Sequence, residues 1–261
     1  MSENILEINN LSKYFGGLAA VSDCTIKVKK GTITGIIGPN GSGKTTLFNL
    51  IAGNLKSSGG NVFFNNEEIT DVPSYELFSK GLLRTFQIAH EFTNLSVLEN
   101  LMMVPGNQSG EKLMNTFLKP SLVAKEETQI KEKAMEVVEF LNLSHLKNEL
   151  AGNLSGGQKK LLELGRTMMV DAKLVLLDEV GAGVNRTLLK DLGTAIEKLN
   201  KEKGYTFCMI EHDMDFIGRL CDPVIVMAEG SVLFEGSVED AKKDEKVIES
   251  YLGRGSQLKG N

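Results

Sequence analysis

Gly38-Pro39-Asn40-Gly41-Ser42-Gly43-Lys44-Thr45 is the stretch that decides the fold, because it matches the phosphate-binding pattern G-x-x-x-x-G-K-[ST] in full. The β-branched run at 32–37 precedes it and predicts a buried strand. The apolar residues at 46–52 recur at helical spacing and predict a helix, with Gly53 as its stop signal. The sequence therefore predicts strand, glycine-rich loop and helix, which is the context that such a loop requires.

This loop offers a phosphate two kinds of positive partner. Its glycines let the backbone approach an anion closely, and successive N–H groups point inward in front of the helix dipole. We expect Lys44 to contact the β- and γ-phosphates, Thr45 to ligate Mg²⁺ through its hydroxyl, and Thr46 to complete the nucleotide-binding loop. The alternative, a glycine-rich turn with a chance Lys-Thr pair, does not explain both flanks. The loop alone predicts binding of a nucleoside triphosphate and no particular reaction.

Composition narrows the class of protein. The chain has 261 residues, 41% of them apolar, and a net charge of −5 without a long basic run, which argues against a protein that coats nucleic acid. No apolar run reaches the roughly 18 residues needed to cross a bilayer, and the acidic start at 1–4 is unlike a signal peptide, so we expect a cytosolic protein. Cys24, Cys208 and Cys221 are isolated and predict buried thiols rather than a metal site.

Strand and helix patterns divide the chain into three kinds of segment. Short strands with turn signals at 5–9, 25–29 and 61–64 predict an antiparallel sheet beside the phosphate loop. Strands and helices alternate from about 173 to 220, which predicts a mostly parallel sheet. Between these parts, residues 95–155 read as an inserted helical segment.

The inserted segment and the core together predict the fold class. We expect an α/β fold with a P-loop NTPase core, an N-terminal antiparallel β subdomain and an inserted α-helical subdomain. Residues 1–261 would form a single domain, with the core at 1–94 and 156–261 and the helical subdomain at 95–155. Within the latter, Ser96 and Glu99 predict a capping box, 105–123 looks irregular, and 125–143 is the longest expected helix, with its apolar residues on one face.

Two adjacent carboxylates end the apolar strand predicted at 173–178. Such a pair at the carboxyl edge of a sheet is costly unless it is paired or bound to metal. Beside a phosphate loop, Asp178 would hold Mg²⁺, usually through water, and Glu179 would orient and deprotonate an attacking water. The alternative is that both are ordinary residues of a solvent-facing turn.

Leu154-Ser155-Gly156-Gly157-Gln158 predicts a second anion site. Ser155 offers a hydroxyl, and the two glycines offer unobstructed N–H groups at the start of a helix. Gln158 belongs to the same turn, and the alternative for all of it is a simple helix cap. Because one triphosphate rarely needs two phosphate sites on one chain, we expect each site to serve a different copy of the protein.

Five elements in a fixed order resemble the ATP-binding cassette (ABC) family. They are the phosphate loop, Gln87, the turn at 154–158, the Asp178-Glu179 pair and His212. The resemblance covers almost the whole chain. It implies an ATPase that works as a head-to-tail pair of cassettes with two ATP molecules at the seam. Each ATP would contact the phosphate loop of one cassette and the Ser155 turn, the family's signature, of the other.

The resemblance also implies individual roles. Phe15 would stack on adenine, with Tyr14 as the second choice. Gln87 would sense Mg²⁺ and the γ-phosphate, and His212 would contact the γ-phosphate. The expected catalytic residues are therefore Lys44, Gln87, Glu179 and His212. The expected metal-binding residues are Thr45, Gln87 and Asp178.

Less specific sequence features resemble the cassettes of branched-chain amino acid importers, a subgroup that includes cassettes for urea and short amides. These features lie at 15–17, 84–87, 105–123, 210–214 and 251–253. This implies as partners a second cassette, identical or related, integral-membrane permeases and, indirectly, a solute-binding protein, at the cytoplasmic face of the inner membrane. A soluble ABC regulator without a transport role is the alternative. A DNA-repair cassette is disfavoured, because no long heptad repeat or cysteine cluster separates the phosphate loop from the signature.

Two positions depart from the family pattern. Val180 follows Glu179 where the family usually has proline, and Asn185 stands where many members have aspartate. The first departure raises the question of what holds the turn after the expected base. The second keeps a hydrogen-bonding side chain but removes a charge.

Overall fold

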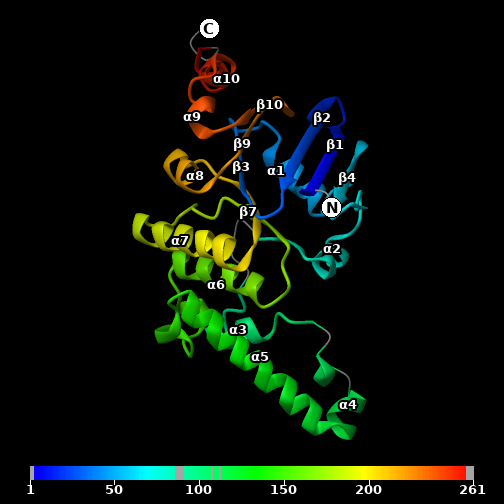
Figure 1. Ribbon diagram of the computed structural model, residues 1–261, viewed down its shortest axis with the longest axis vertical. Helices are drawn as coiled ribbons and strands as arrows, with labels where there is room; N and C mark the ends of the chain where they lie inside the picture. Colours follow the sequence, from blue (N-terminus) through cyan, green and yellow to red (C-terminus); the bar gives the residue numbers. More distant parts are fainter. Residues whose placement is uncertain (1–2, 86–90, 107, 112, 257–261) are drawn as a thin grey trace. The chain divides into compact units, whose positions relative to one another are not determined.

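The computed structural model describes residues 3–85, 91–106, 108–111 and 113–256. The chain forms two compact units (Figure 1). The first comprises 1–87, 173–182 and 196–261, and the second comprises 88–172 and 183–195. The helical segment expected at 95–155 lies within the second unit; the division of the single domain at these residues stays a prediction.

A six-stranded sheet forms the centre of the first unit. Its strands are β10 (Ser231–Gly236), β9 (Val224–Ala228), β3 (Ile33–Ile37), β8 (Thr206–Ile210), β7 (Leu174–Asp178) and β6 (Leu82–Arg84), in that spatial order. Neighbouring strands are parallel except for β10, which is antiparallel to β9. The predicted mostly parallel sheet is confirmed.

A four-stranded antiparallel sheet in the same unit has the order β2-β1-β4-β5. Its strands are β1 (Asn4–Phe15), β2 (Leu18–Lys29), β4 (Gly59–Phe64) and β5 (Glu67–Glu68). The antiparallel sheet was predicted, but β1 and β2 are far longer than the stretches expected at 5–9 and 25–29. Register shifts between Ile8 and Leu11 and a left-handed Asn10 interrupt the alternation on which a sequence prediction depends.

Helix α1 (Lys44–Ile51) packs within a core to which both sheets contribute. Leu47 and Phe48 are fully buried among residues of β1, β3 and β7. This packing holds the helix behind the phosphate loop, because burial of its apolar face stabilises it against the two sheets.

The remaining helices of the first unit are α2 (Ser74–Lys80), α8 (Met214–Leu220), α9 (Val238–Ala241), α10 (Glu245–Ser256) and the later part of α7 (Arg186–Lys203). The helix expected at 214–220 is confirmed, and Asp213 caps it by accepting hydrogen bonds from two backbone N–H groups. Helix α2 was not predicted. It is short, and it begins after Pro73 without a side-chain cap.

The second unit is helical. It holds α3 (Val97–Met102), α4 (Leu113–Leu118), α5 (Pro120–Phe140), α6 (Gly156–Met168) and the start of α7 (Figure 1). The capping box of Ser96 and Glu99 is confirmed at α3. The irregular segment expected at 105–123 is wrong in part, because it contains α4 and the start of α5, where Pro120 lies at the first helical position that proline favours.

Within the described residues, no helix combines the length and the apolarity that crossing a membrane requires.

Candidate functional site

Strand register brings the segments that carry Lys44, Glu179 and His212 to one edge of the parallel sheet. Strand β8 lies between β3 and β7, and Ile210 pairs with both Ile36 and Asp178. The residues that follow these three positions therefore leave the sheet at the same level. The carboxyl edge of neighbouring parallel strands is where open α/β sheets bind ligands.

Backbone contacts fix the phosphate loop at its glycines. Gly38 has φ 149°, and a Cβ there would lie 2.2 Å from the carbonyl oxygen of Met227 on β9. Gly43 has φ 100°, and a Cβ there would lie 2.4 Å from the carbonyl oxygen of Ala20 on β2. Both positions therefore require glycine, so contacts with two other strands determine the loop's shape.

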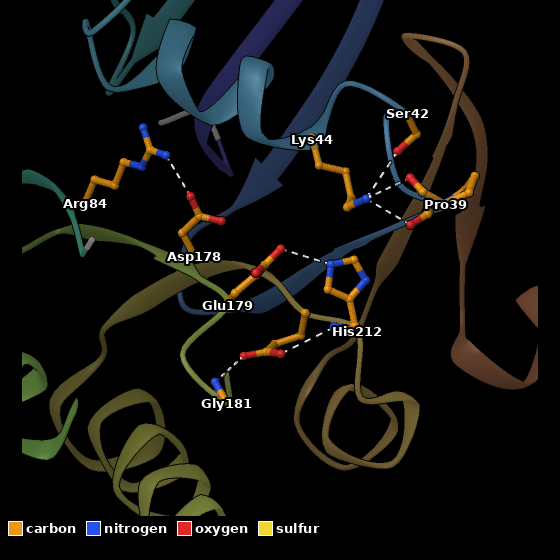
Figure 2. A network of polar contacts seen from close by, with 10 residues as sticks. Pro39, Ser42, Lys44, Arg84, Asp178, Glu179, Gly181 and His212 are labelled. Carbon is orange, nitrogen blue, oxygen red and sulfur yellow. Dashed lines mark hydrogen bonds and ion pairs between the residues drawn. The ribbon is translucent and has the colours of Figure 1, made fainter. Parts of the chain in front are cut away.

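The ammonium group of Lys44 lies against its own loop (Figure 2). Its Nζ donates to Gly38 O at 2.9 Å, to Pro39 O at 3.0 Å and to Ser42 Oγ at 3.4 Å, and the residue is only 5% exposed. A bound phosphate would compete with these oxygens for the same donors. The structure thus places a buried positive charge at the loop, and its contact with the β- and γ-phosphates stays a prediction.

The other residues of the predicted loop differ in exposure, from the buried Gly38 and Ser42 to residues that solvent can reach. Asn40, Gly41 and Thr45 are exposed, and Thr46 is half-buried. Thr45 lies in the first turn of α1, where a helix N-terminus favours negative charge. Nucleotide-binding roles for these residues stay predictions.

Asp178 ends β7 and is nearly buried, at 3% exposure. Its Oδ2 pairs with Arg84 Nη2 at 2.7 Å (Figure 2), and Arg84 Nη1 donates to Asn49 Oδ1 at 2.6 Å. Within the described part of the chain, Oδ1 of Asp178 has no partner. No sequence motif predicts Arg84 as the cation beside this carboxylate.

Glu179 directly follows β7 and adopts the left-handed conformation, with φ 49°. Non-glycine residues occupy this region at a cost of about 1–2 kcal/mol, and such strain is found at functional sites. Glu179 Oε1 lies 3.0 Å from His212 Nε2, so the two residues predicted to act in catalysis are in direct contact (Figure 2).

Glu211 holds the two loops that carry these residues. Its Oε1 accepts from Gly181 N–H at 2.7 Å and its Oε2 accepts from His212 N–H at 3.3 Å. Burial raises the pKa of Glu211 above its usual value, while these two hydrogen bonds act in the opposite direction. Sequence reasoning missed this residue, although its signal, an acidic residue directly after a buried strand, was present.

Glu211 also bears on the departure at Val180. The turn after Glu179 is closed by Ala182 N–H donating to Glu179 O at 3.1 Å, and Glu211 fixes Gly181 within it. Val180 itself is buried at 4% exposure. Tertiary hydrogen bonds and burial therefore hold this turn where a proline would stiffen it.

The signature turn lies in the second unit and caps α6. Ser155 Oγ accepts from Gln158 N–H at 3.4 Å, and Ser155 N–H donates to Gln158 Oε1 at 2.9 Å. Ser155 and Gly156 are exposed, whereas Gly157 is buried against Leu188 of α7. The helix cap considered as an alternative is present, and it leaves the serine accessible.

Three further expectations have different outcomes. Phe15 lies at the exposed end of β1, 48% accessible, with Lys13 Nζ 5.2 Å from its ring centre. Gln87 lies outside the described residues, so its predicted role is untested. Asn185 Oδ1 accepts from Leu188 N–H at 2.9 Å, which uses its amide oxygen locally at the start of α7.

One contact near the phosphate loop comes from the C-terminal helix. Burial raises the pKa of the Tyr251 phenol on α10, and a hydrogen bond with the backbone of Gly38 acts in the opposite direction. In the sequence, Tyr251 stood out only through the resemblance of 251–253 to other cassettes.

These features define a class of protein. A glycine loop at a helix N-terminus, a buried lysine and carboxylates at the edge of a parallel sheet make a P-loop nucleotide-binding protein. The ABC transporter family model matches residues 21–182. The probable branched-chain amino acid transport ATP-binding protein LivG of Archaeoglobus fulgidus is 45% identical over 249 residues, which are 95% of each chain. The chain therefore belongs to the ABC transporter family, as an ATP-binding cassette of the kind that hydrolyses ATP.

Solved structures agree with this assignment. The ADP conformation of MJ1267, an ATP-binding cassette of an ABC transporter, is 40% identical with a TM-score of 0.83, over 97% of this chain and all (100%) of that one. A nucleotide-free ATP-binding cassette from an ABC transporter is 41% identical with a TM-score of 0.82, over 95% of this chain and 98% of that one. The predicted P-loop NTPase fold is confirmed.

Proposed function

We propose that this chain is the ATP-hydrolysing subunit of an importer for branched-chain amino acids, with Glu179 as the general base. The named function of the Archaeoglobus relative, branched-chain amino acid transport, supports the choice of solute. The contact between Glu179 and His212 beside the phosphate loop is the observation that carries the catalytic part.

Each side chain has a distinct task in hydrolysis. Glu179 takes the proton of the attacking water, and His212, in contact with it, keeps the carboxylate oriented and reaches toward the γ-phosphate. Lys44 exchanges its contacts with loop carbonyls for phosphate oxygens and stabilises the charge that develops on them. Gln87 completes the predicted set.

The donor set fits Mg²⁺ better than a metal held entirely by protein. Among the described residues, no group of three or more histidine, cysteine and acidic side chains could hold a metal ion. One carboxylate, Asp178, and one hydroxyl, Thr45, are what Mg²⁺ uses when substrate phosphates and water supply its other ligands. When bound, Mg²⁺ would neutralise charge on the phosphates.

The signature turn supports a working pair of cassettes. Ser155 Oγ accepts a hydrogen bond within its cap, yet its hydroxyl proton stays available for donation to a phosphate of a facing cassette. The N–H groups at the start of α6 add the positive end of a helix dipole. We infer that ATP closes two cassettes, identical or related, and that hydrolysis reopens them.

The motion of the pair would drive membrane partners. Cassettes named for transport imply integral-membrane permeases, and an importer implies a solute-binding protein. The chain would therefore act at the cytoplasmic face of the membrane, bound to permeases rather than inserted itself.

Replacing Glu179 by glutamine tests the catalytic assignment. The amide keeps the size of the side chain but cannot accept a proton, so ATP binding should persist while turnover falls about 100-fold or more. Glu229 is the matched control, because it has the same φ of 49° and is exposed in the β9–β10 turn; Glu229→Gln should hydrolyse ATP normally. Wild-type turnover by Glu179→Gln would remove Glu179 from the role of base.

The solute requires a separate measurement. Cells lacking this chain should lose uptake of labelled leucine, isoleucine and valine, and the wild-type gene, but not Glu179→Gln, should restore it. Loss of urea or amide uptake with normal leucine uptake would instead favour the neighbouring substrate class.

A further inference from the structure

Arg84 makes a buried ion pair, and the proposed hydrolysis mechanism gives this residue no role. Its guanidinium contacts Asp178 Oδ2 at 2.7 Å and Asn49 Oδ1 at 2.6 Å. The side chains of Arg84 and Asp178 are 13% and 4% exposed, so water screens the pair little. The two partners come from different elements, α1 and β7.

The geometry of the guanidinium is set by these two partners. Arg84 Nε is buried with no hydrogen-bond partner among the described residues. An unpaired buried donor is costly, so the contacts with Asp178 and Asn49 outweigh that cost. An arginine fork can hold two acceptors at fixed angles, whereas a lysine offers a single point charge.

The contact with Asn49 connects Arg84 to the predicted metal site. Asn49 follows Thr45 by four residues on α1, so the two side chains lie on the same face of the helix. One guanidinium thus joins the strand that carries Asp178 to the helix that carries Thr45. These are the two described residues to which the proposed function gives Mg²⁺.

We propose that Arg84 is a positioning residue for this metal site. It engages Oδ2 of Asp178, which leaves Oδ1 as the oxygen that faces the metal, and it fixes the strand of Asp178 relative to the helix of Thr45. This proposal rests on the proposed function, because it presumes that Asp178 serves Mg²⁺. Partners that orient a metal ligand typically change metal affinity when they are removed.

The rival explanation is that Arg84 only neutralises a buried carboxylate. A carboxylate left without its cation would then destabilise the whole sheet edge, and nucleotide would bind less well with or without metal. Metal-dependent and metal-free binding therefore separate the two explanations.

The experiment measures ATP affinity by titration calorimetry in turnover-blocked Glu179→Gln protein, once with Mg²⁺ and once with EDTA. Arg84→Met should weaken Mg²⁺-dependent binding by about 10- to 100-fold, the range expected for removing a residue that orients a metal ligand. Binding of metal-free ATP should change less than about twofold, because the phosphate loop and Lys44 are untouched. Asn49→Leu keeps the ion pair and removes the second contact, so it should act in the same direction but less strongly.

Lys80 provides a matched control. It pairs with Glu67 at 2.8 Å, close to the Arg84–Asp178 distance, but on the exposed surface of the same unit. Lys80→Met should leave both affinities unchanged. Binding of Mn²⁺ to the ATP complex, followed by electron paramagnetic resonance, should show the same order of variants without any turnover.

The outcomes distinguish this proposal from the function on which it rests. If Asp178→Asn loses Mg²⁺-dependent binding but Arg84→Met and Asn49→Leu do not, Arg84 has no positioning role. Equal losses with and without metal in Arg84→Met overturn the proposal in favour of charge neutralisation. If Asp178→Asn itself keeps the full Mg²⁺ dependence, the metal role of Asp178 is wrong and the proposal fails with it.

Discussion

The phosphate loop and the signature turn both place N–H groups at a helix N-terminus, but different contacts hold them. The phosphate loop depends on distant segments, since Gly38 meets the backbone of Met227 and Gly43 meets that of Ala20. The signature turn is closed by its own residues, Ser155 and Gln158, in a capping box. The tertiary fold thus shapes the phosphate loop, whereas the proposed anion site at the signature turn is largely local.

This difference suggests how each site responds to change. A substitution at a loop glycine that packs against another strand should destabilise the first unit as well as the loop. A locally capped helix end can lose binding capacity while the fold stays intact.

Gly38→Ala should lower the free energy of unfolding more than any other substitution considered. The added Cβ would lie 2.2 Å from Met227 O in a left-handed conformation, and backbone strain of this kind should cost about 2–4 kcal/mol in the free energy of unfolding. Urea denaturation measures this cost. In contrast, a Cβ at Gly156 would meet only Gly183 O at 3.7 Å, so Gly156→Ala should stay within about 0.5 kcal/mol of wild type. Equal losses at the two glycines would abolish the distinction between the sites.

Lys44→Met should act next most strongly, on nucleotide affinity. The substitution removes charge-assisted hydrogen bonds worth about 1.5–3 kcal/mol, or roughly 10- to 100-fold in the dissociation constant. Ser155→Ala should leave the affinity of a single chain for ATP nearly unchanged, because the signature would serve a facing cassette. Calorimetry at concentrations that keep the chain monomeric compares the two variants; a matching loss in Ser155→Ala would mean that both sites serve the same chain.

Ser155→Ala should instead cost about 1 kcal/mol of stability, the usual loss for an N-cap serine. Ser96 is the matched control, since it heads the same kind of capping box at α3. Ser96→Ala should lower the thermal midpoint by a similar amount and keep normal ATPase activity, whereas Ser155→Ala should lose most of that activity. If both variants hydrolyse ATP normally, the signature turn is a helix cap and nothing more.

Sequence reasoning succeeded where the pattern is local. The strand at 206–210 and the helix at 214–220 have the predicted bounds, and the motif residues of both anion sites lie at helix starts as expected. It failed where a bulge breaks the alternation, as at Asn10 in β1. It also missed α2, whose seven residues offer too few turns to show a periodicity.

The missed site residues have a common physical reason. Arg84 meets Asp178 across 94 positions of sequence, and Glu211 meets Gly181 across 30. Neither pairing has a fixed spacing that a motif could capture, because strand order and register decide it. The residues proposed to contact a nucleotide can be recognised from their spacing, whereas those that hold them in place require the fold.

Glu211→Gln should have the smallest effect of these substitutions, and that effect should depend on pH. Burial raises the pKa of Glu211 from its ordinary value of 4.5, so the folded chain retains this proton to a higher pH than the unfolded chain does. Its contribution to stability is therefore fully present below about pH 4.5 and is lost as the pH rises through the folded value. Glutamine cannot titrate, so the stability of wild type relative to Glu211→Gln should be greater at pH 5 than at pH 8. Urea denaturation at both values measures this difference. If the difference stays constant or grows toward pH 8, the two hydrogen bonds to Glu211 outweigh its burial. The loops that carry Glu179 and His212 would then be held by a carboxylate whose ionisation costs little stability.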